Sequence, residues 1–479
     1  MLFNSVAFLL FFPTVVIVYF ALPHRLRNAW LLAASLFFYM YWRVSYGLLL
    51  LITAGIDYSA GLLMGKTQSN HTRKILLGFS LISNLGILFF FKYFNFFNQT
   101  LRDLLQTWQI SCSLPFSNFL LPVGISFYTF QSLSYTIDVY RRAIPVESCF
   151  SRFLLYVTFF PQLVAGPIER AKNLLPQLYK KFEFDYDRVS QGLMLMAWGF
   201  FKKLVIADRL AIYVDTVYNH PQDFTGWPVW LATYFFALQI YCDFSGYSDI
   251  AIGAARVMGF SLMKNFRRPY YAKSIHEFWQ RWHISLSTWF RDYLYIPLGG
   301  NRVRRTRWYY NLFVVFLVSG LWHGANWTFV IWGGLHGFYL LFSIWTAPWR
   351  QKIIKELSLE RWPTLLKVVR IGITFHLVLF SWVFFRAASL ADALTILHHM
   401  TVMTSMHQAV ALGKVELMVA FIALLILEIV QLYQRHQDGW LHLHHQPRWL
   451  RWCLYCGLLL MILLFGQMAT EQQFIYFQF

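Results

Sequence analysis

The residues best placed to do chemistry lie at 318–327, where one imidazole interrupts a long apolar run. His323 follows Trp322 there, and the flanking segments 308–318 and 328–345 are nearly free of charge. A titratable side chain at bilayer depth is a functional candidate, because lipid tolerates it only where it faces protein or water. Neutral imidazole accepts a proton near neutral pH, so His323 is a candidate for chemistry that involves proton transfer. The alternative is a structural histidine that is hydrogen-bonded within a helix bundle.

The residues around His323 add polar groups and room for close packing. Gly320 and Gly324 allow another backbone to approach closely. Trp322 and Asn326 add N–H groups at a depth where lipid tolerates polar groups only if they face protein or a cavity. We therefore include Trp322 and Asn326 as substrate-binding candidates.

Two carboxylates, Asp243 and Asp249, lie within an apolar run at 229–253. One interpretation is interhelical hydrogen bonding or pairing with basic residues such as Arg256. The other is direct contact of Asp243 with substrate.

Segment 274–293 has the pattern of an amphipathic helix outside the spans. Ser274 and Glu277 form a capping box at its start. We expect one continuous helix that lies at the cytoplasmic interface or dips into a cavity of the protein, with heavy aromatic content that includes the substrate-binding candidate Trp279. Its opposite, polar stripe comprises His276, Gln280, His283, Ser287 and Arg291.

A turn followed by a cationic run occupies 297–307. Its arginines suit the phosphates of a polyphosphate ligand, and they suit inner-leaflet lipid equally well. The candidates for binding these phosphates are Arg302, Arg304, Arg305 and Arg307.

The composition indicates which kind of structural element positions these side chains. The chain has 479 residues, of which 58% are hydrophobic and 13% charged, and this exceeds the apolar content of soluble domains. We predict an all-α polytopic membrane protein with eleven or twelve transmembrane helices. The apolar runs are 2–22, 29–42, 46–63, 75–97, 119–139, 190–206, 229–253, 309–322, 325–345, 371–385, 415–433 and 450–468.

The formal charge of +19 comes from Lys and Arg clustered between the runs, which is typical of the positive-inside rule rather than of nucleic-acid binding. Segments 107–118, 210–228 and 387–411 contain no Lys or Arg. This asymmetry predicts that the basic segments lie in the cytoplasm and that both termini lie outside it. Segment 150–167 is apolar but contains two prolines, so we expect it to re-enter the membrane and pack against protein.

No metal site is predicted. The Cys-x-x-Cys pair, Cys453 and Cys456, lies inside an apolar run, where redox or zinc chemistry is improbable. The histidine-rich tract 436–445 lacks fixed ligand geometry, so composition alone does not make it a metal site.

Five motifs in order resemble the membrane-bound O-acyltransferase (MBOAT) family, and most closely its alginate O-acetyltransferase-like branch. They are FFPQLVAGPI at 159–168, YCDFSGY at 241–247, EFWQRWHISLS at 277–287, FRDYLYIPLGGN at 290–301 and LWHG at 321–324. The resemblance implies a single membrane domain over 1–479, with a motif-bearing core at about 120–345 and peripheral spans at 1–97 and 371–470. It also implies a central funnel through the bilayer, with His323 and His283 as the catalytic histidines.

The function implied is an inner-membrane acetyltransferase. It would take acetyl groups from cytoplasmic acetyl-CoA, a substrate rather than a cofactor, and supply them for O-acetylation of an exported polysaccharide. A periplasmic acetylesterase-like partner would complete the transfer in systems that this chain resembles. The alternatives are peptidoglycan or teichoic acid acylation, and a proton-coupled transporter in which His323 and Asp243 relay protons.

Overall fold

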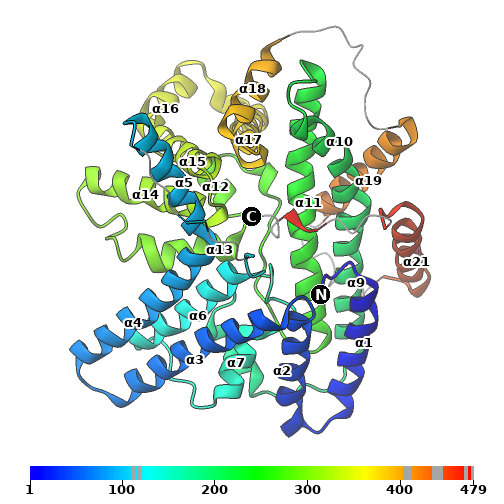
Figure 1. Cartoon of the computed structure of the whole chain (residues 1–479). Coiled ribbons are helices and arrows are strands. Elements are labelled where there is room, and N and C mark those ends of the chain that lie inside the picture. The colour runs from blue at the N-terminus through cyan, green and yellow to red at the C-terminus, as the bar shows by residue number, and fades with distance from the viewer. Residues whose placement is uncertain (111–114, 117–119, 403–412, 434–445, 469–472, 476–479) are drawn as a thin grey trace. The chain divides into compact units, whose positions relative to one another are not determined.

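A computed structural model describes residues 1–110, 115–116, 120–402, 413–433, 446–468 and 473–475 (Figure 1). All regular secondary structure within these ranges is helical. The described chain divides into two compact units, and both are discontinuous in sequence. Unit 1 comprises 1–196 with 248–263, and unit 2 comprises 197–247 with 264–475. Helices α9 and α11 contribute residues to both.

Unit 1 contains the N-terminal helices. They are α1 (Val6–Ala21), α2 (His24–Met40), α3 (Val44–Lys66), α4 (Asn70–Leu88), η1 (Phe89–Tyr93), α5 (Phe94–Thr107), α6 (Ile125–Tyr140), α7 (Phe150–Thr158), α8 (Ala171–Leu178) and most of α9 (Tyr186–Phe200).

Unit 2 contains the remaining helices. They are η2 (Phe201–Ala207), α10 (Asp208–Asn219), most of α11 (Trp227–Val257), η3 (Pro269–Tyr271), α12 (Ile275–Trp279), α13 (Ile284–Phe290), η4 (Arg291–Tyr295), α14 (Arg305–His323), α15 (Trp327–Trp345), α16 (Ala347–Glu356), η5 (Leu359–Arg361), α17 (Pro363–Arg386), α18 (Leu390–Thr401), α19 (Lys414–Tyr433) and α21 (Arg448–Phe465).

The prediction of an all-helical membrane protein is confirmed. Each apolar run named above coincides with a helix, and seven helical segments of the described chain are long and apolar enough to cross a membrane. The seven are 44–66, 70–107, 186–219, 327–345, 363–386, 414–433 and 448–465. The protein is therefore a multi-pass membrane protein.

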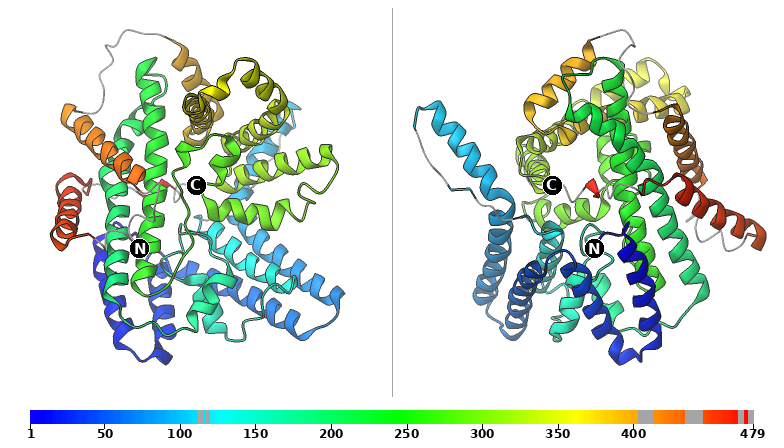
Figure 2. Two further views of the ribbon diagram at one scale, coloured as in Figure 1. Left: turned by 180° about the vertical axis from the view of Figure 1, so that it is seen from behind. Right: turned by 45° about the vertical axis from the view of Figure 1, so that its right-hand side comes forward.

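In unit 1, α3, α4 and α6 pack against one another around a buried carboxylate (Figures 1 and 2). Asp57 of α3 accepts hydrogen bonds from Ser80 (2.5 Å) and Asn84 (2.8 Å) of α4, and from Ser132 of α6. These bonds satisfy a charge-bearing group within a span and join three helices, as polar side chains commonly do in membranes.

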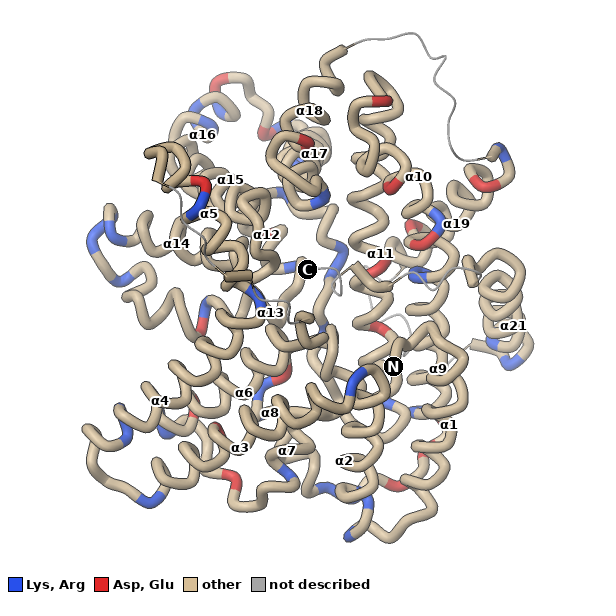
Figure 3. Tube along the Cα trace, in the orientation of Figure 1, with Lys and Arg blue, Asp and Glu red and all other residues tan. Residues whose placement is uncertain are grey.

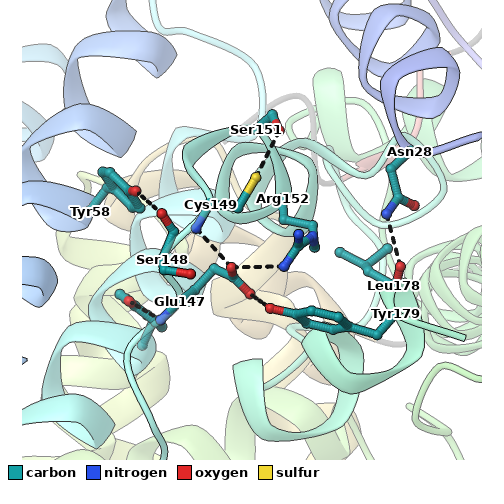
Figure 4. Close-up of polar contacts among 10 residues, drawn as sticks. Asn28, Tyr58, Glu147, Ser148, Cys149, Ser151, Arg152, Leu178 and Tyr179 are labelled. Carbon is teal, nitrogen blue, oxygen red and sulfur yellow. Dashed lines mark hydrogen bonds and ion pairs between the residues drawn. The ribbon is translucent and has the colours of Figure 1, made fainter. Parts of the chain in front are cut away.

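A second polar cluster ties α7 to α8 (Figure 4). The Glu147 carboxylate accepts from the Tyr179 hydroxyl (2.7 Å), from Arg152 (3.1 Å) and from the backbone N–H of Cys149 (2.9 Å). The chain that follows α7 is not helical and is buried throughout 159–170. The predicted packing of segment 150–167 against protein is thus confirmed for unit 1.

In unit 2, α14 and α15 form the most extensive helix pair, and they lie side by side in Figure 1. A Cβ on Gly320 of α14 would meet the Phe329 carbonyl oxygen and lie 3.1 Å from the Gly333 Cα atom of α15. The two backbones approach this closely because neither glycine has a side chain. The end of α14 that carries His323 is thereby fixed against α15.

The single helix predicted over 274–293 is wrong. The capping contact is present, because the Ser274 hydroxyl accepts from the Glu277 backbone N–H at 3.1 Å. However, α12 ends at Trp279, and α13 begins at Ile284 after His283, whose backbone is left-handed (φ 43°). The chain therefore turns at His283, and the predicted polar stripe does not lie along one helix.

Candidate active site

His323 is the last residue of α14 and is buried, with 3% of its surface exposed. Its ring lies in an aromatic cage: the ring centroids of Trp322 and Trp332 are both 5.0 Å away, in edge-on orientation, and that of Phe385 is 5.4 Å away. The residues come from α14, α15 and α17, so three helices fix the imidazole. The cage excludes bulk water, which strengthens electrostatic interactions within it.

His283 lies beside His323, with the two ring centroids 6.4 Å apart. It is fully buried and contacts the Phe244 ring edge-on at 4.7 Å. The sequence placed His283 on an exposed polar stripe, and the structure corrects this. The left-handed turn described above carries His283 inward, next to the other imidazole.

The protonation state of His283 follows from its hydrogen bonds. The Asn265 carbonyl oxygen accepts from the Ser285 backbone N–H (3.2 Å), which identifies that end of the amide as oxygen. The same oxygen faces His283 Nδ1 at 3.2 Å, so Nδ1 carries the proton and Nε2 carries the lone pair. Burial lowers the pKa of His283 to about 3 and keeps the ring neutral.

This arrangement can perform proton transfer. Two buried imidazoles lie within reach of one small reacting group, and one of them is held as a neutral tautomer with its lone pair on Nε2. General base catalysis of attack by a hydroxyl requires such a neutral nitrogen. Asn265 orients His283 and was not singled out from the sequence, because no local pattern links it to a residue in another element.

A third buried histidine, His336 of α15, was also missed. The Trp279 indole N–H donates to His336 Nδ1 (3.3 Å), and His336 Nε2 lies 2.9 Å from the Ser381 hydroxyl. Ser381 in turn donates to the Val378 carbonyl (2.7 Å), so His336 Nε2 is the protonated nitrogen. The signal was present, since His336 is a titratable residue in an apolar run, as His323 is.

Two of the substrate-binding candidates adjoin the histidines. Trp322 is buried, and its ring lies 5.0 Å from His323 and 6.1 Å from His283. Trp279 is 5.0 Å from His336 and commits its N–H to that residue. Trp322 therefore lies at the site itself, and Trp279 lies behind it.

The other candidates have structural partners. The Asn326 amide donates to the Ala388 carbonyl (3.0 Å), and its oxygen caps α15 by accepting from Thr328 N (3.0 Å), so both ends of this side chain are engaged. Arg291 is exposed at the start of η4 and pairs with Asp292 (2.8 Å).

Asp243 belongs to a buried ionic cluster. Lys203 of η2 pairs with Asp243 (2.6 Å) and with Asp208 (2.8 Å). The second Asp243 oxygen accepts from the backbone N–H of Ile475 (2.8 Å), and Lys203 lies 4.3 Å from the Phe474 ring centroid. This matches the pairing interpretation, with Lys203 rather than Arg256 as the partner. The cluster fixes the described C-terminal residues onto unit 2.

The arginines at 302–307 are exposed around the start of α14 (Figure 3). Because α14 is continuous from Arg305 to His323, the rise from Arg307 to His323 is about 24 Å at 1.5 Å per residue. The described residues contain no group of His, Cys, Asp or Glu that could hold a metal ion. The histidine-rich tract 436–445 lies outside the described ranges.

Comparison with known proteins identifies what this arrangement resembles. The family model described as MBOAT, the membrane-bound O-acyltransferase family, matches residues 5–390. The probable alginate O-acetylase AlgI of Pseudomonas aeruginosa is 42% identical over 400 residues, which cover 82% of this chain and 73% of that protein. The peptidoglycan O-acetyltransferase of Helicobacter pylori is 37% identical, over 84% of this chain and 80% of that protein. The teichoic acid D-alanyltransferase of Bacillus subtilis is 29% identical, over 57% and 70%.

Proposed function

Because this chain belongs to the membrane-bound O-acyltransferase family, we propose that it acetylates an exported polysaccharide from the inner membrane. It takes acetyl groups from cytoplasmic acetyl-CoA and passes them across the membrane. The proposal rests on one observation above all, the pairing of His283 and His323 at 6.4 Å inside an aromatic cage. The identity to the alginate O-acetylases and the order of the motifs support the acetyl group and the polymer.

The chemistry is transfer of the acetyl group from a thioester to a hydroxyl, which forms an oxygen ester. The acceptor hydroxyl oxygen attacks the acetyl carbonyl carbon, and its proton passes to the imidazole of His323. The tetrahedral intermediate then collapses, the C–S bond breaks, and the leaving thiolate takes the proton from the imidazolium. His283, neutral with its lone pair on Nε2, receives a hydrogen bond from the acceptor or the thiol and orients it.

The donor enters from the basic side. A nucleotide with several phosphates cannot enter hydrocarbon cheaply, so only the pantetheine arm reaches His323. Arg302, Arg304, Arg305 and Arg307 hold the phosphates in this proposal, and the rise of about 24 Å along α14 is comparable with the length of the extended arm. The distribution of basic segments supports a topology with this end in the cytoplasm and both termini in the periplasm.

The proposed acceptor polymer is taken from the names of the similar proteins. An alginate-like exported polymer is the first choice, because the relatives at 42% and 43% identity are probable alginate O-acetylases. In this proposal a periplasmic acetylesterase-like protein completes the transfer. Peptidoglycan is the second candidate, because the Helicobacter relative matches a larger share of this chain at 37% identity. The transporter alternative is not carried forward, because the chain is an acyltransferase by family.

The proposal is tested with purified protein in liposomes. Radiolabelled acetyl-CoA is supplied on one face only, and labelled acetate or acetylated oligosaccharide is measured on the other. We expect transfer with oligomannuronate and the periplasmic partner, and none when the donor is supplied on the opposite face. Transfer to peptidoglycan fragments alone would select the second candidate, and no turnover of acetyl-CoA with either acceptor would reject the proposal.

A further inference from the structure

Helix α15 presents two buried hydrogen-bond donors one turn apart. Thr328 and Trp332 are both fully buried, at 0% exposure. Within the described chain, neither the Thr328 hydroxyl nor the Trp332 indole nitrogen has a hydrogen-bond partner. Because they are four residues apart in one helix, they lie on the same face. Buried tryptophan N–H groups usually find an acceptor, so such a pair calls for an explanation.

The position of Trp332 supplies that explanation. Its ring is edge-on to His323 at 5.0 Å, the same separation as that of the neighbouring Trp322. It is also held by Phe385 at 5.2 Å and by His336 at 5.0 Å. Several neighbours therefore fix the indole beside the proposed base.

His336 is a reason for this rigidity. Its own ring is locked by Trp279 on one nitrogen and by Ser381 on the other. The indole of Trp279 is thus already committed as a donor, whereas that of Trp332 is not. A donor that is fixed in place but not engaged is the form that electrostatic preorganisation requires.

The reaction produces the missing acceptor. When the acceptor hydroxyl attacks the thioester, the carbonyl π electrons move to oxygen, and a negative charge develops on that atom near the base. We propose that the Trp332 indole N–H, together with the Thr328 hydroxyl, donates to this oxygen as it becomes the oxyanion. The assignment rests on the proposed acyl transfer and makes both residues catalytic. Collapse of the intermediate returns the electrons to the carbonyl and expels the thiolate.

Matched variants test the assignment in the full-length protein. Trp332→Phe removes the N–H and keeps an aromatic ring, and Thr328→Val removes the hydroxyl and keeps the shape. Trp382→Phe is the control, because its indole nitrogen is also buried without a partner, and it stacks on Trp332 at 5.9 Å. Thr328→Ser is the conservative variant, because it keeps the hydroxyl and removes only the methyl group.

We expect kcat for acetyl transfer to fall about 10²–10³-fold in Trp332→Phe, with the KM for acetyl-CoA changing less than about threefold. In Thr328→Val, kcat should fall at least about tenfold. In Thr328→Ser, which keeps the hydroxyl, kcat should stay close to the wild-type value. Trp382→Phe should stay within about threefold of the wild type, with a thermal midpoint similar to that of Trp332→Phe.

Two results would overturn this inference and leave the proposed function standing, provided that the wild type is active and His323→Gln is inactive. One is a Trp332→Phe variant that keeps kcat within about threefold of the wild type. The other is an equal loss in Trp382→Phe, which would show a packing effect. A wild type without acetyl-CoA turnover would overturn both this inference and the proposed function.

Discussion

The imidazole rings of His283 and His323 lie 6.4 Å apart in the same unit, although one follows α12 and the other ends α14. Asn265 makes this possible. Its side-chain oxygen accepts from His283 Nδ1 and from the backbone and hydroxyl of Ser285, so it fixes both the turn and the tautomer. The active site thus depends on a residue that does not itself need to contact substrate.

Asn265 and His283 should therefore behave as one functional group. We expect Asn265→Ala and His283→Gln each to lower kcat/KM at least about tenfold, and the double variant to be little worse than either. Ser285→Ala is the control, because it removes only one of the bonds to Asn265. Steady-state kinetics on the wild type and these four variants provide the measurement. Losses that multiply in the double variant would show that the two residues act independently.

Acid should destabilise the protein partly through His283. Its folded pKa of about 3 lies below the unfolded value of about 6.5, so the unfolded state binds a proton that the folded state excludes. The corresponding stability is fully present above pH 6.5 and is lost progressively as pH falls towards 3. Thermal midpoints in detergent should drop more steeply between pH 7 and 5 for the wild type than for His283→Gln. Parallel pH profiles would contradict this.

The buried ionic cluster should respond unequally to loss of its members. Lys203 neutralises two carboxylates, so Lys203→Met leaves Asp208 and Asp243 buried together. Asp243→Asn leaves Lys203 paired with Asp208. Breaking a buried pair costs about 3–5 kcal/mol, and we expect Lys203→Met to be the more destabilising of the two in unfolding by denaturing detergent. Equal losses of stability in the two variants would contradict the prediction that two unneutralised carboxylates cost more than the loss of one ion pair.

The arginines at the start of α14 should determine the affinity for acetyl-CoA. Replacing Arg304, Arg305 and Arg307 together with Gln should raise the donor Kd and flatten its dependence on salt, because fewer charge contacts remain to be screened. A triple Gln variant of the exposed residues Lys352, Lys355 and Arg361 is the control. Titration in neutral detergent at two ionic strengths measures both quantities. Unchanged Kd and salt slope would leave lipid anchoring as the role of these arginines.

The helices were predictable because hydropathy reports directly on lipid burial. The left-handed turn at His283 was not, since it depends on Asn265 in another segment, and helical periodicity continues across it in the sequence. Asp243 was recognised as a buried carboxylate, yet its partner Lys203 comes from a different helix and could not be read from spacing. His336 is a titratable residue in an apolar run, as His323 is, but it lies outside the Trp-His-Gly motif, and its partners Trp279 and Ser381 come from other helices.

The central claim is that His323 accepts the proton of the attacking hydroxyl. His323→Gln keeps a hydrogen-bonding side chain in the cage but cannot take up a proton near neutral pH. Single-turnover transfer from labelled acetyl-CoA, with donor Kd and thermal midpoint measured on the same preparation, tests the claim most directly. We predict a loss of about 10²–10⁴-fold in the transfer rate with donor binding and folding retained. A variant that keeps more than about a tenth of the wild-type rate would contradict the assignment.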